Sequence, residues 1–193
     1  EFLEMLIGRA EAIRIGDPLH EDTQMGPLAT EAQRDRIEAV VAESREQGAT
    51  VHTGGKRPEG FGTGWYFEPT VLGCDSQLIR STQVELFGPV MSVLRFESEE
   101  EAVAMANDSV FGLGAGVFTT DVGRAHRVAK AVRSGIVWVN TYRAISPIAP
   151  FGGFGQSGHG REAGLDTIYD YTRTKTVWIN TSEDPMANPF VMR

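Results

Sequence analysis

Cysteine is almost absent from this sequence. Cys74 is the single one among 193 residues, so the chain cannot form an internal disulfide and fits a reducing compartment. Long apolar runs are missing as well, because the longest are far too short to span a bilayer. No signal-peptide pattern opens the chain. These absences predict a cytoplasmic protein that has no membrane partner.

Positive charge is also scarce. The chain has 18 Lys and Arg against 26 Asp and Glu, which gives a net charge of −8. Without a basic stripe, the sequence offers no surface for nucleic acid or for an anionic membrane. The four histidines lack the spacing of metal ligands, so we expect no metal site. The remaining composition, with 41% hydrophobic and 23% charged residues, is that of an ordinary globular protein.

Helical and strand-like patterns alternate along the chain. A helical pattern already runs at Glu1 with no cap before it, which suggests a chain cut from something longer. Thr30, Ser98 and Asp121 stand where N-caps belong. At Thr30 the spacing to Gln33 further predicts a capping box, in which the two residues satisfy each other's backbone donors. The strand-like stretches are residues 49–53, 65–72, 90–96, 115–118 and 136–140.

This alternation predicts an α/β fold with a largely parallel sheet and flanking helices. The glycine-rich stretch 54–64 does not predict a phosphate cradle, because no Lys-Ser/Thr pair and no helix follow it. A hairpin or surface loop is expected there instead. Residues 1–171 form the main domain in this interpretation. Residues 172–180 add a C-terminal strand suited to pairing with another chain or to completing its own domain, and residues 172–193 form the tail.

Glu85 and Phe87 stand just before Gly88-Pro89 and the apolar run that starts at Val90. The Gly-Pro pair bends the chain, which predicts an ordered loop at the lip of the sheet. Binding residues are often found on such loops. The alternative is that Phe87 caps the core while Glu85 is only solvated. Residues 141–165 form a second long irregular stretch, rich in glycine, that we expect to be functional.

These features together resemble the aldehyde dehydrogenase superfamily. The likeness rests on the segments 85–90, 137–140, 150–153 and 157–162, together with Ile15-Gly16-Asp17-Pro18 and Gly26-Pro27. It covers nearly the whole chain in the right order. The resemblance implies the later part of such an enzyme, comprising most of the catalytic domain and the oligomerisation tail. It also implies association as a homodimer or homotetramer.

The resemblance further implies that the cysteine nucleophile, the general-base glutamate and the nucleotide-binding domain lie upstream of Glu1. No residue of this chain is therefore expected to be catalytic, and the 193-residue chain alone is expected to be inactive. Cys74 follows a strand in a polar turn with no histidine beside it in sequence. We interpret it as structural.

The resemblance assigns cofactor and substrate contacts, with NAD or NADP as the cofactor and a small-molecule aldehyde as the substrate. Glu85 would accept from the nicotinamide ribose hydroxyls, and Phe87 would pack beside the ring. Gln33 and Arg36 match positions near the cofactor's ribose, although surface helix residues are the alternative. The substrate tunnel would include three residues, Phe151, Ile145 and Arg143, the last as a possible partner of a substrate carboxylate.

Two other functions remain open at this stage. An acylating or acyl-phosphate reductase relative on the same fold would replace water with a thiol or phosphate acceptor. A non-catalytic structural protein could also use this scaffold, since fold does not fix function. The residues upstream of Glu1 would distinguish the three.

Overall fold

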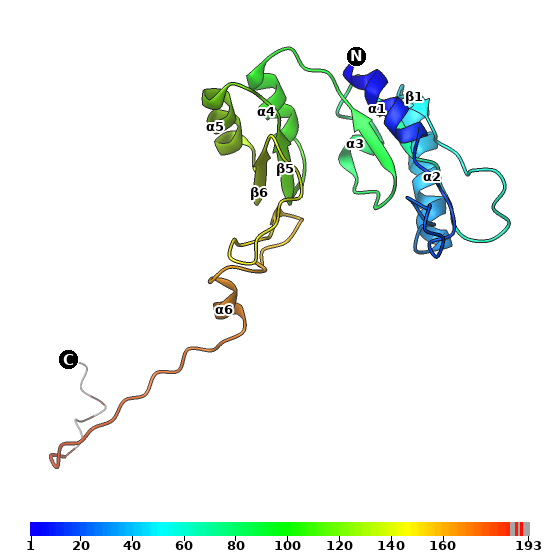
Figure 1. Ribbon diagram of the computed structural model, residues 1–193. Helices are drawn as coiled ribbons and strands as arrows, with labels where there is room; N and C mark the ends of the chain where they lie inside the picture. The colour runs from blue at the N-terminus through cyan, green and yellow to red at the C-terminus, as the bar shows by residue number, and fades with distance from the viewer. Residues whose placement is uncertain (186–187, 189, 191–193) are drawn as a thin grey trace.

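A computed structural model describes residues 1–185, 188 and 190 of the chain (Figure 1). The helices and strands, in chain order, are α1 (Phe2–Glu11), α2 (Glu31–Glu46), β1 (Thr50–Thr53), β2 (Thr70–Gly73), α3 (Arg80–Gln83), β3 (Val90–Val93), α4 (Glu99–Asn107), β4 (Phe111–Gly112), β5 (Gly114–Val117), α5 (Val122–Ala131), β6 (Ile136–Val139), β7 (Phe154–Gly155) and α6 (Thr167–Asp170).

The elements form two groups that follow one another along the chain (Figure 1). In the first group, β1 pairs antiparallel with β2, and β2 pairs parallel with β3. Helix α1 packs on β1 and β2, and α3 packs on α2. The core lies here, and its most deeply buried members are Phe67, Ile37, Leu72, Val41 and Val71. Ile37 and Val41 lie four residues apart and so share one face of α2.

The second group contains α4, α5 and two small sheets. β5 and β6 run parallel in register, from Gly114 opposite Ile136 to Val117 opposite Val139. β4 and β7 form a short antiparallel pair that joins Gly112 to Phe154. Helix α5 packs on β5, β6 and α4. The α/β class predicted from the sequence is therefore confirmed, although the strands form three small sheets with two parallel and two antiparallel pairings.

Side-chain caps begin three of the helices, as the sequence predicts. Thr30, Ser98 and Asp121 each accept a hydrogen bond from the backbone N–H three residues on. The second half of the predicted Thr30 box is not formed, because the Gln33 side chain turns to another part of the chain, described below. The stretch 54–69 simply connects the antiparallel strands β1 and β2, as a hairpin or surface loop would.

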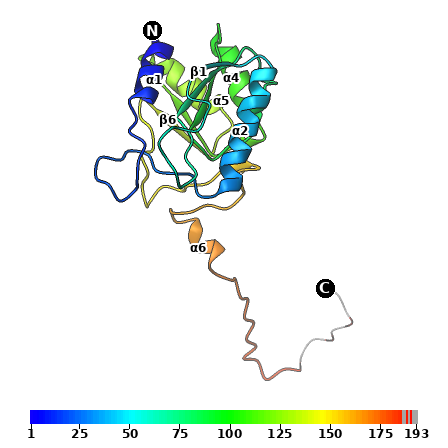
Figure 2. The ribbon, with the colours of Figure 1, turned by 90° about the vertical axis from the view of Figure 1, so that its right-hand side faces the viewer.

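Beyond α6 the chain runs away from the two groups (Figures 1 and 2). Residues 172–180 are not a strand in this structure, because a strand requires hydrogen bonds to a neighbour and the segment has none here. Val177, Trp178 and Ile179 are 66%, 93% and 80% exposed. The segment therefore completes no sheet among the described residues, and its pairing, with another subunit or within its own domain, stays a prediction.

Candidate functional site

The loop between α3 and β3 presents two side chains to solvent and buries a third. Leu86 is 7% exposed and belongs to the core cluster. Its neighbours Glu85 and Phe87 both lie at the surface, with Phe87 74% exposed. Because the buried leucine anchors the loop, the carboxylate and the ring are held at the surface of an ordered segment. The alternative in which Phe87 caps the core is wrong.

Two residues of α2 bind this loop through its backbone. The Gln33 side-chain amide donates to the carbonyl of Leu86 and, at 3.3 Å, to that of Phe87. The Arg36 guanidinium donates to the carbonyl of Glu85 at 3.0 Å. The structure thus brings the four residues predicted to bind the cofactor together. Gln33 and Arg36 do so by binding the backbone of the loop that carries Glu85 and Phe87.

A cavity of about 440 Å³ lies beside Glu85. Its lining combines the end of α3 and the following loop with β4, the start of β5 and the turn before β6. Ser157, from the late glycine-rich stretch, also lines it and accepts a hydrogen bond from the Gly112 N–H at 3.1 Å. Glu85 therefore shares a cavity with that stretch, whereas Phe87 is outside its lining.

The three residues predicted for the substrate tunnel lie elsewhere. Arg143 and Ile145 belong to the exposed loop after β6, where the guanidinium of Arg143 lies 6.0 Å from the ring centre of Tyr142. Phe151 is half-buried and exchanges two backbone hydrogen bonds with Glu162. None of the three lines the cavity beside Glu85. Their role at a substrate site stays a prediction.

Trp138 holds the loop that follows β6, a contact that the sequence analysis missed. Its indole N–H donates to the carbonyl of Ala144 at 2.8 Å, and its ring meets that of Tyr142 edge to face at 5.3 Å. A tryptophan N–H near a strand end usually finds a partner, which was the available signal. The partner itself could not be read from the sequence.

Comparison with known proteins identifies the family to which this fold and this loop belong. The model of the aldehyde dehydrogenase family matches residues 1–177. The chain belongs to the aldehyde dehydrogenase family. It is 51% identical, over its whole length, to a (Z)-2-((N-methylformamido)methylene)-5-hydroxybutyrolactone dehydrogenase from Acinetobacter baylyi, and it covers 39% of that protein.

Two betaine aldehyde dehydrogenases are also similar to this aldehyde dehydrogenase family chain. The one from Brucella melitensis is 46% identical over 92% of the chain, which covers 37% of that protein. The crystal structure of the one from Staphylococcus aureus in complex with NAD+ matches with a TM-score of 0.90 and 38% identity, over 100% of this chain and 38% of that one. The chain thus spans about two fifths of the length of its relatives.

Cys74 is not placed to serve as the nucleophile of an aldehyde dehydrogenase. It is 4% exposed, belongs to the core cluster and lies 3.9 Å from the Ser81 hydroxyl. A thiol that reacts with substrate must be accessible and ionisable, and Cys74 is sealed among apolar side chains. The structure agrees with its interpretation as a structural residue.

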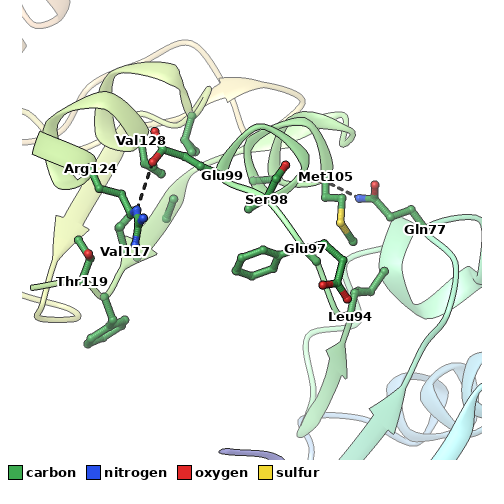
Figure 3. A pocket seen from close by; sticks show the side chains of 17 residues that line it. Gln77, Leu94, Glu97, Ser98, Glu99, Met105, Val117, Thr119, Arg124 and Val128 are labelled. Carbon is green, nitrogen blue, oxygen red and sulfur yellow. Dashed lines mark hydrogen bonds and ion pairs between the residues drawn. The ribbon is translucent and has the colours of Figure 1, made fainter. Parts of the chain in front are cut away.

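A second cavity, of about 680 Å³, is lined by the segment that follows β3 and by residues of α4, β5 and α5 (Figure 3). Leu94, Met105, Val117 and Val128 contribute its apolar lining, and the Glu99–Arg124 ion pair lies at its edge. None of the sequence-predicted site residues lines it.

Among the described residues no helix has the length and apolarity that crossing a bilayer requires. Nor do any three described His, Cys, Asp or Glu side chains gather to hold a metal ion.

Proposed function

We propose that this chain is the C-terminal part of a longer aldehyde dehydrogenase, below called the parent protein. The parent protein would oxidise an aldehyde to a carboxylic acid with NAD or NADP, through a thioester with a cysteine outside this chain. Family membership over residues 1–177 supports this proposal. The observation that carries it is the exposure of both Glu85 and Phe87 on one anchored loop.

Glu85 and Phe87 fit a dinucleotide cofactor. An ionised carboxylate only accepts hydrogen bonds and has two oxygens, so Glu85 can take both hydroxyls of a ribose. The exposed ring of Phe87 offers a flat apolar surface to the nicotinamide. The bound cofactor would supply the acceptor for the hydride that leaves the aldehyde. The two side chains would fix its sugar and its ring, which orients the reacting atoms.

Arg143, Ile145 and Phe151 would shape the substrate end of the same active site. Ile145 is 68% exposed and Phe151 half-buried, so both present apolar surface for an aldehyde chain. Arg143 would suit an aldehyde that also carries a carboxylate. The loop that bears Arg143 and Ile145 is tied to β6 by the bond from Trp138 to Ala144.

We further propose that residues 172–193 form an oligomerisation tail, of which 186–187, 189 and 191–193 lie outside the described residues. Segment 172–180 would add a strand to another subunit, in a dimer or a tetramer. Support comes from the exposed apolar side chains at 177–179 and from the unpaired backbone along the segment. Edge strands with this composition pair with a neighbouring sheet.

The test of the proposed function is Glu85→Gln in the parent protein. The change keeps the shape of the side chain but removes its charge and one acceptor. We expect hydride transfer to slow, or the cofactor dissociation constant to rise, by about tenfold, equivalent to about 1.4 kcal/mol. Single-turnover formation of the reduced cofactor measures the first effect, and calorimetric titration measures the second.

Glu46→Gln is the matched control, because Glu46 is an exposed carboxylate at the end of α2 and is expected to change neither quantity. Unchanged kinetics and affinity in Glu85→Gln would remove the cofactor role. The 193-residue chain alone should reduce no more cofactor than its own Cys74→Ser variant. Aldehyde-dependent turnover above that level would show that the nucleophile is not upstream.

A further inference from the structure

We propose that Gln33 and Arg36 are positioning residues, which hold the 85–88 loop in the shape that cofactor binding needs. The proposal rests on the proposed cofactor role of Glu85 and Phe87. To the expectation for the family, in which both α2 residues approach the cofactor, it adds a role that acts through the loop backbone.

The three consecutive carbonyls of Glu85, Leu86 and Phe87 receive their side-chain donors from one helix. Gln33 donates to the carbonyls of Leu86 and Phe87, and Arg36 donates to that of Glu85. The loop lies outside the sheet, so its carbonyls have no strand to pair with and need other donors. Residues three apart lie on the same face of a helix. One turn of α2 therefore grips the loop from a single side.

The backbone of the loop also lies directly on α2. A Cβ added at Gly88 would stand 2.2 Å from the Cδ1 atom of Ile37, which is fully buried. A side chain at position 88 would therefore force the buried Ile37 side chain to shift. Gln33, Arg36 and Ile37 thus act from the same face of the helix, two through hydrogen bonds and one through packing.

Phe87 needs this support because its φ of 49° is left-handed. Bulky residues resist that conformation, and it persists only where the surroundings hold it. The angle sets the direction in which the ring leaves the backbone, relative to the Glu85 carboxylate two residues earlier. Loss of the hydrogen bonds to the loop carbonyls would therefore let the side chains of Glu85 and Phe87 change direction.

The amide of Gln33 has two N–H donors, and the two loop carbonyls engage it. The donors of this side chain are therefore used by the loop backbone, and its Oε1 is left as an acceptor. The helix start does not depend on that side chain, because the Thr30 hydroxyl accepts from the Gln33 backbone N–H at 3.2 Å. Replacement of the Gln33 side chain therefore removes its hydrogen bonds to the loop and leaves the helix cap at Thr30 in place.

The first experiment measures amide hydrogen exchange in the parent protein without cofactor. We expect Gln33→Met and Arg36→Met each to speed exchange at residues 85–88 by about tenfold, while exchange within α2 stays as in the original protein. Arg45→Met is the matched control, an exposed arginine on the same helix. Arg36→Lys, which keeps one donor, should restore most of the protection. Unchanged loop exchange in both methionine variants would overturn the proposal.

The second experiment is a double-mutant cycle on the dissociation constant of NAD+ or NADP+, whichever the parent protein binds more tightly. Gln33→Met should raise the constant by about fivefold, and in the Glu85→Gln background by less than twofold, since the two residues act through one contact. Equal effects in both backgrounds would show an independent contact and overturn the positioning role. If Glu85→Gln alone changes nothing, the proposed function fails, and the exchange experiment still decides whether α2 holds the loop.

Discussion

Asn140 closes the end of the β5–β6 pair with its own side chain. Its Oδ1 accepts from the Thr119 backbone N–H and its Nδ2 donates to the Thr119 carbonyl, both at 2.8 Å. The residue has a φ of 54°, a left-handed conformation that asparagine adopts more readily than most residues. Its side chain thereby adds two hydrogen bonds beyond the end of the strand pair, and its backbone sets the direction in which the following loop leaves β6.

Asn140→Ala should lower the free energy of unfolding by about 1–2 kcal/mol, because two solvent-exposed hydrogen bonds are lost and alanine resists the left-handed angle. Asn140→Gly loses the same bonds but accepts the angle, so it should cost about 1 kcal/mol less than alanine. Urea denaturation of the three proteins measures both differences. Equal stability of the alanine variant and the original protein would show that the two bonds contribute nothing.

At the scale of elements, the sequence predicted helices better than strands. The cap residues Thr30, Ser98 and Asp121 mark three helix starts correctly because a cap is a local interaction. The strand-like stretch 65–72 reaches the sheet only at Thr70, after Pro69, since proline cannot donate to a ladder. Strand limits depend on the neighbour that supplies the hydrogen bonds, which no local pattern contains.

The site could be predicted in part for the same reason. A Gly-Pro bend ahead of an apolar strand correctly indicated an ordered loop that exposes Glu85 and Phe87. The sequence also suggested that the Gln33 side chain would cap its own helix. That prediction was wrong, because the side chain instead reaches Leu86, 53 residues further on. Contacts over such separations arise from tertiary packing and leave no local signal.

Glu99 joins α4 to α5 and makes their contact sensitive to pH. Its carboxylate accepts from Arg127 at 2.7 and 2.8 Å and from Arg124 at 3.2 Å. The hydrogen bonds from Arg127, more than those from Arg124, hold the pKa of Glu99 below its ordinary value of 4.5. Because the folded-state pKa is the lower one, this stabilisation is complete above about pH 4.5 and is lost as the pH falls through the folded-state value.

Glu99→Gln should therefore destabilise the protein at pH 7 and make little difference well below pH 4. Chemical denaturation across this pH range measures the free energy of unfolding of the original protein and of the variant. The difference between the two should narrow as the pH falls. Glu46→Gln, at an exposed position on α2, is the control and should show no such narrowing. A gap that stays constant with pH would contradict the ion-pair account.

At the scale of the whole molecule, the chain leaves much apolar surface uncovered. Phe96, Phe118 and Trp178 are 59%, 72% and 93% exposed, and the first two line the cavity between the end of β3 and β5. Soluble proteins rarely leave large apolar patches open unless something covers them. This agrees with the proposal that the chain is part of a longer protein, because its core is confined to the first group of elements.

The tail offers the most direct test of assembly, since strand pairing and simple apolar contact respond differently to proline. Val177→Pro removes a backbone donor, and proline is excluded from a strand that is paired on both sides. In the parent protein it should raise the subunit dissociation constant at least about tenfold, or about 1.4 kcal/mol. Val177→Thr, the control, keeps the donor and a β-branched shape, and should leave assembly nearly intact. Light scattering over a dilution series measures the mass of each variant, and an unchanged mass for Val177→Pro at every concentration would show that segment 172–180 adds no strand to a neighbouring subunit.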